Sequence, residues 1–160
     1  MKSENRSHEE TNQQVVYSFF TEVGIINQLI STKLESMLPG RMSATQFGIL
    51  GHLSRRPRGE TPLQLSNAFQ VPKTSMTHML SVLEQLQLIS LAPHPDDGRS
   101  KVAKTTKKGA MFLQQTNMEM GNALAPVLSN LSDTPFKKAL PHLERVRIAL
   151  DEERDSPQSN

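Results

Sequence analysis

Long stretches at both ends of the chain place apolar residues three or four positions apart, the spacing of one face of a helix. The pattern predicts an N-terminal helix over residues 13–40, which ends at a Pro-Gly pair. It also predicts two C-terminal helices within residues 109–154, where Pro126 and Pro141 are expected to kink a helix or mark its start. Each helix is amphipathic, so each needs another surface to cover its apolar face.

The two ends of the chain lack this pattern. Residues 1–12 are polar and charged, and so are residues 155–160. Such segments have little apolar surface to bury, and chain ends are poorly ordered unless something holds them. Both are therefore predicted to be disordered tails.

Two short segments in the middle of the chain have the sequence of a capping box. Ser43 is followed three positions on by Gln46, and Thr61 by Gln64. In such a pair, each side chain accepts a hydrogen bond from the backbone N–H of the other residue. Pro62 occupies the first helical position, where its fixed φ suits a helix. The sequence predicts one helix after each box, the second of them short.

A further helix is predicted from Pro72 to about Gln87, separated from the short helix by only a tight turn. Two helices joined in this way form a helix-turn-helix. Residues 89–93 and 101–105 flank an Asp- and Gly-rich turn, which predicts a β-hairpin. Residues 41–108 are therefore predicted to form a winged helix-turn-helix domain. The predicted fold class is mainly α with a small β-hairpin wing, flanked by N- and C-terminal helices.

The apolar faces of the flanking helices are too long for this small domain to cover. Terminal helices with surplus apolar surface usually meet a second copy of the chain, so residues 13–40 and 109–154 are predicted to be dimerisation helices of a symmetric homodimer. The alternative is that these helices fold back on one monomer.

Composition agrees with one small domain that carries helical additions. Of 160 residues, 36% are hydrophobic and only 4% are aromatic, which favours packed helices and disfavours an aromatic platform for single strands. Because there is no apolar run of about 18 residues and no secretory leader, neither a membrane span nor secretion is expected. The chain contains no Cys, which excludes disulfides and thiol chemistry. A cytoplasmic protein is expected.

Positive charge is concentrated in the middle of the chain. Residues 41–108 carry ten Lys and Arg against four Asp and Glu, a net charge of +6, whereas each flank carries −2. This distribution is typical of a surface that binds a polyanion, although charge alone fits a solvated basic surface equally well.

Side-chain chemistry in the predicted helix-turn-helix separates two faces. Residues expected to be core are Met76, Met79, Leu80 and Leu83. The opposite face begins with Lys73, Thr74, Ser75, Thr77 and His78. Hydroxyl groups of this kind contact base edges, and a Lys at this position is expected on a phosphate. His78 is equally compatible with base contact, phosphate contact and solvent exposure.

The order of elements and four motifs resemble the MarR family of bacterial transcription regulators. The motifs are Ser43-Ala44-Thr45-Gln46-Phe47, Thr61-Pro62-Leu63-Gln64-Leu65, Thr74-Ser75-x-Thr77 and Pro95-Asp96-Asp97-Gly98-Arg99-Ser100-Lys101, with Thr106 and Gly109 following the wing. The resemblance covers about residues 13–152. It implies a homodimer made by the terminal helices, a recognition helix in the major groove, and a wing Arg in the minor groove.

The chain departs from the family pattern at four places. Val71-Pro72-Lys73 stands where an Asp cap and an Arg are common, and His78 where a basic residue is common. Gln87 replaces a Gly after the recognition helix, so a left-handed residue there is expected to be strained or replaced. Thr105 replaces a Leu. These differences bear on base specificity rather than on DNA binding itself.

Arg99 is the leading candidate at the predicted wing. A guanidinium is planar, permanently charged and weakly hydrated, so it suits the narrow, electronegative minor groove of A·T-rich DNA. Asp97 is placed to pair with Arg99, and Lys101 lies just beyond the turn. The alternative is an ordinary Asp-Gly hairpin with solvated charges. Six further basic residues are expected to contact phosphates, although about half of them are expected to contribute nothing to binding. They are Arg55, Arg56, Arg58, Lys104, Lys107 and Lys108.

The sequence therefore predicts a sequence-specific regulator of transcription that binds double-stranded DNA at a pseudo-palindromic operator. A homodimeric repressor is expected, and the family resemblance implies relief by a small aromatic effector. The alternatives are a winged helix that binds protein without specific DNA binding and, less favoured, a binder of structured RNA.

Enzyme chemistry is not expected. The chain has no Gly-rich phosphate loop, no His-Glu-x-x-His and no nucleophile elbow, and its five His residues lack metal-ligand spacing. No catalytic residue, cofactor or metal ligand is predicted.

Overall fold

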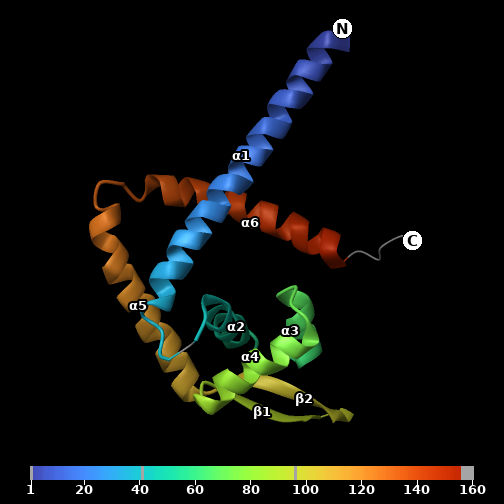
Figure 1. Ribbon diagram of the computed structural model, residues 1–160, viewed down its shortest axis with the longest axis vertical. Helices are drawn as coiled ribbons and strands as arrows, with labels where there is room; N and C mark the ends of the chain where they lie inside the picture. The colour runs from blue at the N-terminus through green and yellow to red at the C-terminus, as the bar shows by residue number, and fades with distance from the viewer. Residues whose placement is uncertain (1, 41, 96, 156–160) are drawn as a thin grey trace. The chain divides into compact units, whose positions relative to one another are not determined.

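The computed structural model describes the backbone of residues 2–40, 42–95 and 97–155, and side chains over these ranges except 2–11, 98–99 and 154–155. The helices are α1 (Lys2–Glu35), α2 (Ala44–Ser54), α3 (Pro62–Ala68), α4 (Lys73–Gln85), α5 (Lys107–Leu128) and α6 (Thr134–Asp155). Two strands, β1 (Ile89–His94) and β2 (Asp97–Thr105), follow α4 and precede α5 along the chain (Figure 1). The predicted fold class, mainly α with a β-hairpin wing, is confirmed.

The N-terminal helix begins earlier than predicted. Residues 2–12, expected to be disordered, belong to α1, which starts at Lys2. Five of these eleven residues are Lys, Glu or Arg, which favour a helix, and none is Gly or Pro, which would break it. They also extend a helix that already exists, and extension needs no new nucleus. At the other end α1 stops at Glu35, and Gly40 has a φ of +63° in the turns that follow.

Both capping boxes are present. Ser43 accepts from the N–H of Gln46 at 3.2 Å, and Gln46 accepts from the N–H of Ser43 at 2.8 Å. The corresponding distances for Thr61 and Gln64 are 3.3 and 2.8 Å. These reciprocal bonds fix where α2 and α3 begin, as the sequence predicts.

Helix α4 ends in a Schellman motif built on a non-glycine residue. Gln87 has a φ of +62°, in the left-handed region. Its N–H donates to the carbonyl of Glu84 at 2.8 Å, and the N–H of Leu88 donates to that of Leu83 at 2.9 Å. These two bonds satisfy the last carbonyls of the helix. The expected strain at Gln87 is therefore present.

The two strands pair in antiparallel fashion as the wing. The register runs regularly from Ile89 opposite Thr105 to Pro93 opposite Lys101, and then shifts so that His94 lies opposite Asp97. A third segment joins this hairpin through an isolated bridge between Glu60 and Ala103. This bridge was not predictable from the sequence, because it involves a single residue of a loop.

The core lies beneath the helix-turn-helix. Its largest fully buried side chains are Ile49, Leu50, Leu53, Leu65, Met76, Leu80 and Leu83. Met76, Leu80 and Leu83 come from α4, and Met79 packs partly buried against them. The predicted inner face of α4 is confirmed.

The chain divides into two compact units, residues 1–120 and 121–160. Within the second unit, α6 exposes large apolar residues, among them Phe136, Leu140, Leu143, Ile148 and Leu150. Pro126 lies inside α5 and Pro141 inside α6, so neither marks the start of a helix. The predicted C-terminal tail is described only as far as Asp155, the last residue of α6, and residues 156–160 lie outside the described chain.

Candidate nucleic-acid interface

The outward face of α4 is polar from its first turn. Lys73, Thr74, Ser75, Thr77 and His78 are all exposed, whereas the neighbouring Met76 is completely buried. The alternation follows from the helical period, which turns the apolar residues inward and leaves the short polar ones outside. The structure thus brings the five residues predicted on this helix to one accessible surface.

The hydroxyl proton of Thr77 is already used in a hydrogen bond within α4. Its hydroxyl donates to the carbonyl of Lys73 at 2.9 Å, one turn earlier on the same helix. In this rotamer the oxygen remains an acceptor and the methyl group remains available for an apolar contact. Thr77 is therefore suited to accept from a base or to touch a thymine methyl, rather than to donate.

The N-terminus of α4 has no side-chain cap among the described residues. Pro72 occupies the N-cap position and cannot supply an acceptor, although its carbonyl accepts from the N–H of Met76 at 2.9 Å. The first N–H groups of a helix carry partial positive charge and suit an anion such as phosphate. The Lys73 ammonium adds positive charge to the same turn.

The wing places its predicted residues on β2. Asp97 is exposed at the start of the strand, and Lys101 is exposed opposite Pro93. Arg99 belongs to the same strand, but its side chain is outside the described part of the structure. The pairing of Asp97 with Arg99 and the direction of the guanidinium stay predictions.

Two of the expected phosphate contacts have partners within the protein. The Nε of Arg56 donates to Glu60 at 2.9 Å. The Nζ of Lys108 donates to the carbonyl of Leu86 at 2.9 Å and to Oε1 of Gln87 at 3.2 Å. Lys108 therefore holds the C-terminus of α4, where a cation is favourable. The remaining candidates are all exposed: Arg55, Arg58, Lys104 and Lys107.

The junction after the wing explains the Thr-x-x-Gly motif. Thr106 donates to the carbonyl of Gln87 at 2.7 Å and accepts from the N–H of Gly109 at 2.9 Å. At Gly109 a Cβ atom would collide with the carbonyl of Leu88, so no other residue fits without movement. The start of α5 is therefore locked to the end of α4.

A cluster that sequence reasoning missed lies behind the wing. His52 Nε2 is 2.8 Å from Glu60 Oε2, and the imidazole ring packs edge-on against Phe69 with centroids 5.5 Å apart. The partners are eight residues apart along the chain and come from a helix and a loop. Sequence spacing alone gives no signal for such a pair.

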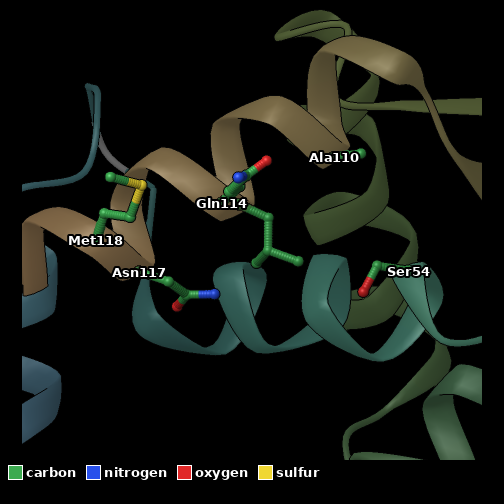
Figure 2. A pocket seen from close by; sticks show the side chains of 6 residues that line it. Ser54, Ala110, Gln114, Asn117 and Met118 are labelled. Atoms are coloured by element: carbon green, nitrogen blue, oxygen red, sulfur yellow. The ribbon is translucent and has the colours of Figure 1, made fainter. Parts of the chain in front are cut away.

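An open groove of about 510 Å³ lies between α2 and the first half of α5. It is lined by Ser54, Ala110, Leu113, Gln114, Asn117 and Met118. Figure 2 shows Gln114, Asn117 and Met118 along α5 and Ser54 on α2. The lining thus combines aliphatic, thioether and amide groups on an open surface.

The described residues contain no group of three or more metal-ligating side chains. Within the same ranges, no helix has both the length and the apolar character needed to cross a bilayer.

Comparison with known proteins places the chain. A sequence model of the family described as "MarR family" matches residues 42–100 of the chain. The Multiple Antibiotic Resistance Repressor, MarR, is 25% identical with a TM-score of 0.64, and the match covers 79% of this chain and 92% of that one. No protein with a curated description matches in sequence.

Two further solved structures show the fold. The transcriptional regulator BldR from Sulfolobus solfataricus has a TM-score of 0.67 at 20% identity, over 86% of this chain and 95% of its own. MepR, a transcription regulator of the Staphylococcus aureus multidrug efflux pump MepA, has a TM-score of 0.61 at 20% identity, over 84% and 97%. The chain is thus similar to the MarR family over residues 42–100 and has the fold of these transcription regulators.

Proposed function

We propose that the protein is a homodimeric repressor of transcription that binds double-stranded DNA at a pseudo-palindromic operator. One observation carries the proposal: α4 exposes Lys73, Thr74, Ser75, Thr77 and His78 directly before a hairpin whose second strand carries Arg99 and Lys101. A polar helix followed by a basic hairpin suits the major groove and the adjacent minor groove. The similar MarR of known structure is named a repressor.

Within this proposal the side chains have separate tasks. Thr74, Ser75, Thr77 and His78 contact base edges, while Lys73 and the first N–H groups of α4 contact phosphate. Arg99 enters the minor groove, and Asp97 holds its guanidinium in place. Arg55, Arg58, Lys104 and Lys107, all exposed, add phosphate contacts.

The dimer rests on the exposed apolar surface of the terminal helices. On α1, Ile26 is 58% exposed and Leu29 is 66% exposed. Such surface is costly in water and is covered when two copies pair. Two recognition helices related by a two-fold axis then contact half-sites one DNA turn apart, about 34 Å. The protein acts where such DNA lies, in the bacterial cytoplasm.

A small aromatic effector relieves repression by binding the groove between α2 and α5. The groove adjoins the first turns of α5, and Lys108 and Thr106 join that end of α5 to the C-terminus of α4. A ligand that shifts α5 therefore shifts the recognition helix. Titration of the DNA complex with simple aromatic acids tests this step. Release from wild type, but not from Met118→Trp, supports it, whereas equal release or no release contradicts it.

Selection of bound duplexes from a random library tests the proposed function as a whole. The full-length protein is expected to enrich a two-fold symmetric sequence whose half-sites are one helical turn apart. Enrichment should be lost in the double variant Thr74→Ala, Ser75→Ala, which keeps the charge and the helix. A library that stays random with the wild-type protein contradicts specific binding and favours a protein-interaction module.

A further inference from the structure

Glu60 lies where three parts of the winged-helix domain meet. It follows α2, precedes α3 and pairs with β2. Its N–H donates to the carbonyl of Ala103 at 3.1 Å, and its carbonyl accepts from the N–H of Ala103 at 2.8 Å. The preceding Gly59 has a φ of +76°, and a Cβ there would collide with the Ala103 carbonyl. The loop is thus fitted closely against the base of the wing.

The Glu60 side chain is fixed on the other side by α2 and the residues just after it. Its Oε2 is 2.8 Å from His52 Nε2, and its Oε1 accepts from Arg56 Nε at 2.9 Å. The Glu60 and His52 side chains are 16% and 18% exposed, whereas Arg56 is 52% exposed. The His52 contact is therefore the more buried of the two, and the Arg56 contact is the more exposed to solvent.

His52 is itself held by packing. Its ring lies edge-on to Phe69, the residue that ends α3. The carboxylate of Glu60 therefore has a partner whose position is set by two helices of the domain. The same residue pairs with Ala103 through its backbone, so the side-chain contacts and the bridge meet at Glu60.

The wing needs such an anchor because a two-stranded hairpin is only marginally stable by itself. Ala103 lies two residues from Lys101 and next to Lys104, both exposed on the same strand. We infer that Glu60 is a positioning residue for the wing: its carboxylate, held by His52 and Arg56, fixes the loop peptide that sets the place of β2. As a statement about DNA binding, this inference rests on the proposed function.

Whether removal of the Glu60 carboxylate raises or lowers affinity for DNA distinguishes a positioning role from a purely electrostatic effect. Removal of a carboxylate from a basic surface by itself strengthens attraction to DNA. Loss of the wing position weakens binding. Glu60→Ala is therefore expected to lower affinity for DNA although it makes the protein more positive.

The test uses the full-length protein and a 30-base-pair duplex of mixed sequence, with affinity measured by fluorescence anisotropy. The variants are Glu60→Ala, Glu60→Gln and, as a control of equal charge change, Glu119→Ala on α5. Glu119 is exposed, and its Oε1 accepts from Nε2 of Gln115 at 2.8 Å on the same helix. Hydrogen exchange of the DNA-free protein is measured at the Ala103 amide and, for global stability, at the Leu80 amide.

Glu60→Ala is expected to bind the duplex about fivefold more weakly and to lose protection at Ala103 while Leu80 is unchanged. Glu60→Gln keeps an acceptor for Arg56 and an amide N–H that His52 Nε2 can accept, so it should retain most of both properties. The inference is overturned if Glu60→Ala binds as tightly as Glu119→Ala, or if Ala103 protection is unchanged or falls only together with Leu80. If the wild-type protein does not bind the duplex, the proposed function fails, and Ala103 exchange alone decides whether Glu60 holds the wing.

Discussion

Thr105 and Thr106 are adjacent residues of the same type with opposite contributions to stability. The hydroxyl of Thr105 is buried and has no hydrogen-bond partner among the described residues. The hydroxyl of Thr106 bonds the carbonyl of Gln87 and the N–H of Gly109. A buried polar group without a hydrogen-bond partner destabilises the folded protein. Removal of one that has partners lowers the stability, because the partners are left unsatisfied.

Thr105→Val is therefore expected to stabilise the protein by about 1 kcal/mol, because it replaces the buried hydroxyl by a methyl group of similar size. Thr106→Val is the matched control and should destabilise by about 1–2 kcal/mol. Urea unfolding at one fixed protein concentration measures both. A loss of stability in Thr105→Val would show that the hydroxyl has a favourable contact.

Arg99 is the residue on which the proposed contact between the wing and DNA depends most. Arg99→Ala should weaken binding to a selected operator by about 1–3 kcal/mol, since it removes a minor-groove guanidinium. Lys138→Ala, an exposed position on α6, removes the same charge away from the proposed interface. Anisotropy titration compares the two. Equal affinity of wild type and Arg99→Ala would remove Arg99 from the interface.

At the scale of elements, the end of α4 has backbone strain at Gln87 that a hydrogen bond from Lys108 partly offsets. Gln87 adopts a left-handed conformation that a glycine adopts without steric penalty, and Lys108 bonds its side-chain oxygen. The bond lies at an exposed position, so it offsets only part of the strain.

Gln87→Gly is accordingly expected to stabilise the protein by about 0.5–1 kcal/mol. Gln85→Gly, two residues earlier and inside the helix, should have the opposite sign with a similar magnitude. Thermal and urea unfolding measure both variants. Destabilisation by Gln87→Gly would mean that the Lys108 contact outweighs the backbone strain.

Local signals made most elements predictable from the sequence. Ser43 with Gln46, and Thr61 with Gln64, fixed the starts of α2 and α3 because capping depends on residues three positions apart. The Glu60 bridge and the His52 contact were not predictable, because they join residues that approach only in the folded chain. The polar composition of residues 2–12 gave no sign that α1 extends to Lys2, because these residues carry no apolar stripe.

At the scale of the whole molecule, the terminal helices determine the proposed assembly. Leu29→Glu on α1 places a charge in the proposed dimer interface and is expected to give monomers, with weaker binding to a two-half-site operator. Gln28→Glu adds the same charge on the opposite, polar side of α1, where Gln28 is exposed, and should leave the dimer intact. Analytical ultracentrifugation measures both. A wild-type protein that is monomeric at micromolar concentration contradicts the dimer.

The central claim is that this basic winged helix binds DNA through its phosphates and grooves. The most direct test is the dependence of duplex affinity on salt concentration. Since each phosphate contact releases a counterion, the logarithm of the binding constant should fall linearly with the logarithm of salt, with a slope of about −0.9 per contact. A steep slope that becomes shallower in Lys73→Ala is the predicted result. Absence of binding at low salt, or affinity independent of salt, would contradict the claim.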